Sequence, residues 1–285
     1  MSRIFLTALL LAAPAGVQSP SAAETRTLSL SITDEKGPAL LGLAPEDVAL
    51  LENGVARDIV SFAPDERPLT VAVLVDTSEA VRTAYRLNVV AAVTGFLAGL
   101  PSGSRFAVWT VGERPTKRVD YTDDVKVAEQ SLQRIAPAGG STLLDALLEA
   151  TKDLRKKEGE RNAVVVLSAV GPEFSSAYRE RVVSEAPGPD TTFFSLMVEE
   201  GATDIENRNN YDYVLERLAK KSGGMFEVTL SPMSLDKEMQ KLLGGLKGQY
   251  RLTYATVPEL KQRKLEVKVA RPKAQTRLAP LGDAK

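Results

Sequence analysis

The chain has 285 residues, of which 44% are hydrophobic and 26% are charged, enough for one large domain or one medium domain with a smaller partner. Lysine and arginine total 36 against 37 aspartates and glutamates, and this balance predicts neither a nucleic-acid partner nor attraction to an anionic membrane. The sequence contains no histidine and no cysteine. This excludes Ser-His-Asp triads, thiol nucleophiles, zinc sites with imidazole or thiolate ligands, and disulfides.

Residues 1–23 have the pattern of an export signal. Arg3 supplies a positive start, residues 4–17 form an apolar core too short to span a bilayer as a mature helix, and small residues up to Ala23 offer a cleavage site. Because no cysteine is present, a bacterial lipid anchor at that site is excluded. We therefore expect an exported, soluble protein, periplasmic or extracellular, that begins near Glu24 and does not insert into a membrane after cleavage.

The next segment, residues 24–68, is rich in strand patterns. Residues 25–43 alternate apolar and polar side chains before a group of turn-forming residues. Residues 47–64 form two short predicted strands around Asn53-Gly54, a dipeptide typical of tight hairpin turns. A small β module is therefore expected to open the mature chain.

Residues 69–247 change to an alternation of strands and helices. Apolar residues recur at helical spacing from Val81 to Leu100 and again from Leu143 to Leu154. Five apolar runs predict strands buried on both faces: 69–76, 104–112, 162–170, 191–199 and 224–229. This order predicts an α/β fold, with a doubly wound, mostly parallel sheet covered by helices on both faces.

The end of the chain returns to strand patterns. Residues 249–256 and 264–271 alternate cleanly and predict half-exposed antiparallel strands. We expect them to pack with the N-terminal strands in one β module. The predicted organisation is a signal peptide at 1–23, β strands at 24–68, an α/β domain at 69–247, and β strands at 248–285.

Two polar segments lie where predicted strands end. Asp76, Thr77 and Ser78 follow the strand at 69–76, and the segment GGSTLLDAL (139–147) precedes a helix. Ligands of open parallel sheets bind outside the carboxyl ends of the strands. Carboxylate and hydroxyl oxygens gathered there suit a hard cation such as Mg²⁺.

These segments resemble the von Willebrand factor type A (VWFA) domain, whose fold is a doubly wound, Rossmann-like sheet. Its metal-ion-dependent adhesion site uses a D-x-S-x-S strand end, a threonine in a Gly-Gly-Thr loop and an aspartate after a later strand. Together with residues 32–62, 218–228 and 246–255, the segments at 73–80 and 139–147 resemble a VWFA-related family of exported bacterial proteins. The resemblance covers nearly all of the expected mature chain.

The resemblance implies an incomplete metal site. Asp76 and Ser78 match the first two ligand positions, and Ser141 or Thr142 matches the loop hydroxyl, with the register between these two left open. Ala80 and Ala169 stand where a third hydroxyl and a second carboxylate belong. We therefore expect no cation at high occupancy and at most weak Mg²⁺ or Mn²⁺ binding, unless Glu173 compensates through a water.

Structural roles are an alternative for the same side chains. Asp76 and Ser78 could cap a helix that begins near Glu79, and Ser141 or Thr142 could cap the helix that follows 139–142. Asp145 lies in the first turn of that helix, where its charge favours the helix dipole. The GGST loop lacks the lysine of a phosphate-binding loop, so nucleotide binding is not expected.

The resemblance implies a non-enzymatic, exported protein that binds another protein, or adheres, through its strand-end surface. Two alternatives stay open: a structural component of a cell-envelope assembly without metal or ligand, and a cation-dependent hydrolase that uses Asp76 and Glu79. The second lacks a general base with an evident reason to be perturbed.

Overall fold

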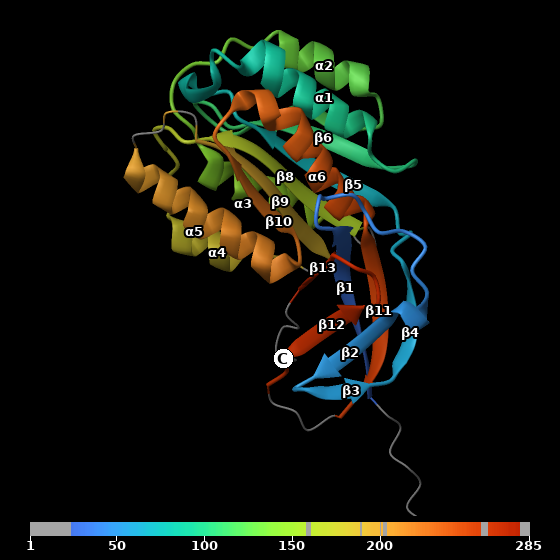
Figure 1. The fold of residues 1–285 in the computed structure, drawn as a ribbon. Helices are drawn as coiled ribbons and strands as arrows, with labels where there is room; N and C mark the ends of the chain where they lie inside the picture. The colour runs from blue at the N-terminus through green and yellow to red at the C-terminus, as the bar shows by residue number, and fades with distance from the viewer. Residues whose placement is uncertain are drawn as a thin grey trace, which may run out of the picture.

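The computed structural model describes residues 24–157, 161–188, 190–199, 201, 204–257 and 262–279. The expected signal peptide lies outside the described residues. The described chain has two parts: an α/β layer structure and a β module beside one end of its sheet (Figure 1). No helix in the described ranges is both long and apolar enough to cross a membrane.

A six-stranded sheet forms the centre of the α/β part, in the order β10-β9-β8-β5-β6-β7. Neighbouring strands are parallel except at β7, which pairs antiparallel with β6. Their bounds are β5 (Leu69–Val75), β6 (Arg105–Thr110), β7 (Thr116–Thr122), β8 (Arg161–Ala169), β9 (Thr191–Val198) and β10 (Met225–Thr229). All seven residues of β5 and all nine of β8 are buried, as strands covered on both faces should be.

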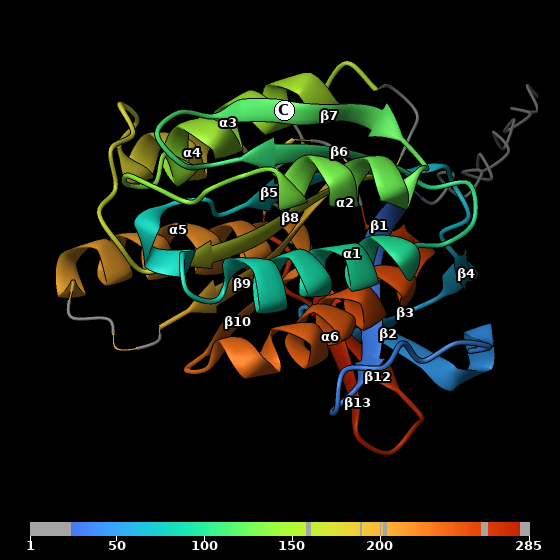
Figure 2. The same cartoon turned by 90° about the horizontal axis from the view of Figure 1, so that it is seen from above.

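Helices cover both faces of this sheet (Figure 2). One face packs against α1 (Val90–Ala98), α2 (Val125–Gln133) and α6 (Leu235–Lys247). The other packs against α3 (Leu143–Leu154), α4 (Arg179–Glu185) and α5 (Ile205–Ser222). The predicted fold class, a doubly wound and mostly parallel α/β sheet, is confirmed.

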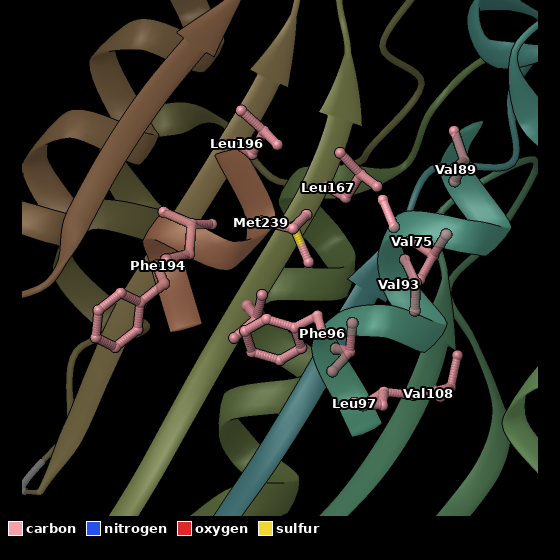
Figure 3. Close-up of a cluster of buried hydrophobic side chains, with 14 of the residues drawn as sticks. Val75, Val89, Val93, Phe96, Leu97, Val108, Leu167, Phe194, Leu196 and Met239 are labelled. Atoms are coloured by element: carbon pink, nitrogen blue, oxygen red, sulfur yellow. The ribbon is translucent and has the colours of Figure 1, made fainter. Parts of the chain in front are cut away.

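The two cores divide the strand side chains by their alternation. Val73 of β5 and Val165 of β8 lie in the core under α1 and α6, while their neighbours Ala72 and Val164 lie in the core under α3 and α5. Figure 3 shows the first of these cores, where Phe96 of α1 lies among strand side chains. Burial on both sides fixes the strand ends, and with them the loops that carry the polar segments.

The segment from Val81 to Leu100 is not one regular helix. A 3₁₀ turn (Glu79–Val81) is followed by a π-helix (Tyr85–Val89) and then by α1. The Tyr85 hydroxyl donates to the carbonyl of Leu132 at 3.2 Å, and its ring is buried. The apolar spacing predicted which residues face the core. It gave no signal for the widened turn that begins at Tyr85.

Strand β7 was also not predicted. Only Val119 of its seven residues is buried, because β7 is the edge strand of the sheet. It pairs antiparallel with β6, with two irregularities in register. The sequence pattern of such a strand is weak.

The β module contains two sheets built from both ends of the described chain. The first has the order β13-β1-β11-β4, with β1 (Glu24–Asp34), β4 (Ile59–Pro64), β11 (Gln249–Thr256) and β13 (Ala274–Leu278). The second has the order β12-β2-β3, with β2 (Val48–Glu52), β3 (Val55–Arg57) and β12 (Leu265–Val269). A 3₁₀ turn at Pro45–Asp47 precedes β2, and another at Pro232–Ser234 precedes α6 in the α/β part. Since β11 pairs with β1 and β4, and β12 with β2, the two ends form one unit.

A buried carboxylate joins the two sheets of the module. Glu52 is fully buried and accepts hydrogen bonds from Tyr254 (3.0 Å), Thr256 (2.8 Å), Arg263 (2.8 Å) and Arg57 (2.9 Å). Burial acts to raise the pKa of Glu52, but these hydrogen bonds outweigh it and hold the pKa below its usual value. The charge is therefore satisfied by partners from both ends of the chain.

We expect Glu52→Gln to lower the free energy of unfolding by about 3 kcal/mol at neutral pH, because the two arginines lose their carboxylate. Since the folded pKa is lowered, the contribution of Glu52 is complete above the usual glutamate pKa of about 4.3 and is lost as the pH falls through the folded value. Urea denaturation at several pH values measures this. Glu266→Gln, at an exposed glutamate, is the control. Equal stability of the two variants at neutral pH would contradict the assigned role.

Candidate functional site

Asp76 follows β5 directly and is fully buried. Its Oδ1 accepts a hydrogen bond from the Ser78 amide at 2.7 Å, and its Oδ2 accepts from the Ala169 amide at 2.9 Å and from the Ser168 hydroxyl at 3.1 Å. Burial raises the pKa of Asp76, and these donors oppose the shift. The carboxylate thus connects the end of β5 to the end of β8.

The Ser78 side chain does not cap the turn that follows it. Its hydroxyl is buried near Asp76 but makes no well-formed hydrogen bond with the described residues. The capping role considered for Ser78 is therefore not what the structure shows.

The two loop hydroxyls have different roles. Thr142 occupies the residue before α3, but its hydroxyl donates to the carbonyl of Gly112 at 2.8 Å. The Ser141 hydroxyl, one residue before that position, accepts from the amide of Leu143, the first residue of α3, at 3.2 Å. Capping by Thr142 was the wrong expectation, because this side chain instead ties the GGST loop to the end of β6.

Glu173 lies on the loop after β8, and its two oxygens are already engaged. Oε2 accepts from the Tyr211 hydroxyl at 2.6 Å and Oε1 from the Ser175 amide at 2.9 Å. Burial raises the pKa of Glu173, opposed by these hydrogen bonds. Burial, together with the charge of Glu173, also raises the pKa of Tyr211.

Main-chain pairing places this loop over the GGST loop. The Ser141 amide donates to the carbonyl of Pro172 and the Phe174 amide donates to the carbonyl of Ser141, both at 2.7 Å. Asp145 adds to this anchoring, because its carboxylate accepts from the amides of Ser176 (2.8 Å) and Ala177 (2.9 Å). Asp145 therefore holds the loop in addition to its place in the first turn of α3.

The alanines at the expected ligand positions have different environments. Ala169 is buried and contributes its backbone amide to Asp76. Ala80 is exposed, and the loop after β8 passes so close that a methyl group on Gly171 would lie 3.0 Å from the Ala80 Cβ. Neither position offers a side-chain oxygen.

The donor set does not fit a tightly held divalent cation. The Asp76 oxygens accept three hydrogen bonds, and the Thr142 hydroxyl points at a carbonyl. No group of three acidic side chains in the described ranges is placed to hold a metal ion. Mg²⁺ requires a near-octahedral shell of oxygens, and the oxygens of Asp76 and Thr142 are already engaged in hydrogen bonds within the protein.

Two residues of the site were missed by sequence reasoning. Ser168 donates to Asp76, and Tyr211 of α5 donates to Glu173. Tyr211 had an indirect signal, since a tyrosine among the apolar positions of a helix needs a partner for its hydroxyl when buried. Ser168 had none, because a serine within an apolar strand gives no indication of its partner.

Comparisons with known proteins agree with this fold. Residues 71–170 match the family model described as von Willebrand factor type A domain. The α/β fold of the chain is the fold of that domain class. A sequence comparison with curated proteins gives no match.

Solved structures with the same fold are distant in sequence. A von Willebrand factor type A protein from Catenulispora acidiphila has a TM-score of 0.52 at 12% identity, with 94% of this chain and 75% of that chain covered. The vWF domain of the type V pili tip protein Mfa5 from Porphyromonas gingivalis has a TM-score of 0.51 at 10% identity, with 63% and 95% covered.

A third similar structure carries a metal. Proximal thread matrix protein 1 from the mussel byssus, described with a zinc-occupied MIDAS motif, has a TM-score of 0.51 at 16% identity. The alignment covers 75% of this chain and 50% of the mussel protein, so this chain spans about half of that protein's length. At these identities the likeness shows the fold alone.

We expect Asp76→Ala to destabilise the protein by about 3 kcal/mol in the presence of a chelator, because two buried amides and a hydroxyl lose their acceptor. Chemical denaturation measures the change. Asp123→Ala, at an exposed aspartate, is the control. If Asp76 served only as a metal ligand, the chelated variant would be as stable as the chelated wild type.

Proposed function

We propose that this chain is an exported, non-catalytic protein that binds another protein through the loops at the carboxyl ends of its parallel strands. The observation that carries the proposal is Phe174. Its backbone is fixed by pairing with Ser141, yet its side chain is 65% exposed. An aromatic side chain held at a rigid loop loses little entropy on binding and is typical of the anchors of protein interfaces.

The GGST loop supports the position of this aromatic ring. A Cβ on Gly140 would lie 2.5 Å from the Phe174 Cε2, so only glycine leaves room for the ring. Tyr178, four residues later, is also 65% exposed. Both lie outside the strand ends, which is where ligands of open α/β sheets bind.

A non-catalytic role agrees with the chemistry of the site. The sequence lacks histidine and cysteine, and the carboxylates of Asp76 and Glu173 both accept hydrogen bonds from the protein itself. Binding of a partner is proposed not to require a divalent cation. The Mfa5 domain, described as part of a pilus tip protein, makes adhesion a reasonable form of this proposal.

Export is the part of the proposal that rests on residues 1–23, with their positive start and apolar core. We expect the protein recovered from native cells to lie in the periplasmic or extracellular fraction, with its N-terminus near Glu24 and no lipid. Cell fractionation followed by intact-mass spectrometry measures this. Recovery of the chain from the cytoplasm with Met1 and the apolar segment intact would rule export out.

We expect a photo-crosslinking amino acid at position 174 to capture one defined protein partner in native cells, with and without a membrane-permeant chelator. The same amino acid at position 41 of the β module is the matched control, because Leu41 is 67% exposed. Mass spectrometry identifies the products. The same products from both positions, or none from position 174, would contradict the proposed binding surface.

A further inference from the structure

Two adjoining clefts lie beside the strand-end loops, on the side of β7. The larger, of about 600 Å³, lies between β7 and α2, and the smaller, of about 300 Å³, lies at the ends of β5 and β6. Both are lined by Arg118, Ile135 and Ala136, so they lie side by side, and we call the pair the double cleft. The smaller cleft lies at the strand ends, because Thr77 and Gly112 line it. Thr77 follows Asp76, and the carbonyl of Gly112 accepts a hydrogen bond from the Thr142 hydroxyl.

Three arginines give this double cleft a positive charge. Arg114 lines the smaller cleft, Arg134 the larger, and Arg118 both. None of the three forms an ion pair with a carboxylate of the described residues, whereas Lys117, next to Arg118 on β7, pairs with Asp153 at 2.7 Å. An arginine without a carboxylate partner keeps its guanidinium available for an anionic ligand.

One acidic side chain, Glu113, lies among the described residues that line the double cleft. Its aliphatic part packs against the loop at Gly139, where a Cβ would lie 3.0 Å from the Glu113 Cγ. The charge of the lining is therefore positive overall.

The rest of the lining is mixed. Val127 and Ile135 are apolar, and Thr116, Gln130 and Ser131 are polar, so the lining combines charged, polar and apolar side chains. Such a surface suits a peptide better than a continuous phosphate backbone, which would need a longer positive track. The net charge of −1 gives no general attraction to polyanions, so binding of an anion requires a local positive group such as this one.

We propose that the double cleft binds an acidic, carboxylate-rich segment of the partner protein through Arg114, Arg118 and Arg134. This inference rests on the proposed function, because it assigns the chemistry of the partner bound at the strand ends. Guanidinium groups bind carboxylates in bidentate geometry, and the apolar positions would accept the side chains between them. The partner is thus recognised by its own charge and by apolar contact.

A fluorescein-labelled hexaglutamate peptide tests this with the full chain. Fluorescence anisotropy is expected to show binding that weakens as salt increases, and Arg118→Gln/Arg134→Gln is expected to weaken it roughly tenfold. Arg251→Gln/Lys36→Gln is the matched control, because it removes the same charge from exposed residues of the β module. Thermal unfolding of both variants checks that each remains folded.

Three results of the binding assay would overturn the proposal: no hexaglutamate binding by the folded wild type, equal loss in the control variant, or tighter binding of labelled oligothymidylate than of hexaglutamate. Crosslinking from position 174 separates this inference from the proposed function. If the partner is still captured at full yield by Arg118→Gln/Arg134→Gln, protein binding stands and the arginine cleft does not take part. If hexaglutamate binds at the arginines but position 174 captures no partner, the cleft is supported and the proposed surface fails.

Discussion

The carboxylate of Asp76 is buried and accepts hydrogen bonds from three donors at the ends of two neighbouring strands. Without the carboxylate, the amides of Ser78 and Ala169 would remain buried and unpaired, at a cost of about 1–3 kcal/mol each. With it, the end of β5 is fixed to the end of β8. The positions of both following loops depend on this contact, so the strand-end surface does too.

The loop after β8 is held in place by contacts with the GGST loop, α3 and α5. Its backbone pairs with Ser141, its Glu173 accepts from Tyr211, and Asp145 holds its next turn. Each of these contacts is a hydrogen bond between protein groups, and none needs a cation. The result is an ordered loop whose Phe174 side chain is exposed.

The fold was predictable because its strands are buried on both faces. Long apolar runs such as 162–170 have a strong pattern, and their alternation with helical spacing leaves few architectures. The edge strand β7 was not predictable from the same rule, since it buries only Val119. The π-helix at Tyr85–Val89 also had no signal in the sequence, because the apolar spacing there is compatible with a regular helix.

The site was predictable in its location but not in its bonding. The motif places Asp76, Ser78, Ser141 and Thr142 at the strand ends, where the structure has them. The two loop hydroxyls differ in their partners: Thr142 donates to the carbonyl of Gly112, distant in sequence, while Ser141 accepts from the nearby amide of Leu143. The hydrogen-bond partner of each hydroxyl depends on the path of the loops, which sequence spacing does not determine.

Calorimetric titration of the metal-free protein with Mg²⁺ and Mn²⁺ tests the central claim, that Asp76 acts through hydrogen bonds rather than through a cation. With one carboxylate at the site and its oxygens engaged, any binding is expected to be no tighter than on the order of millimolar. Micromolar binding that disappears in Asp76→Ala, with a folded variant, would show that the carboxylate is a metal ligand and would contradict the account.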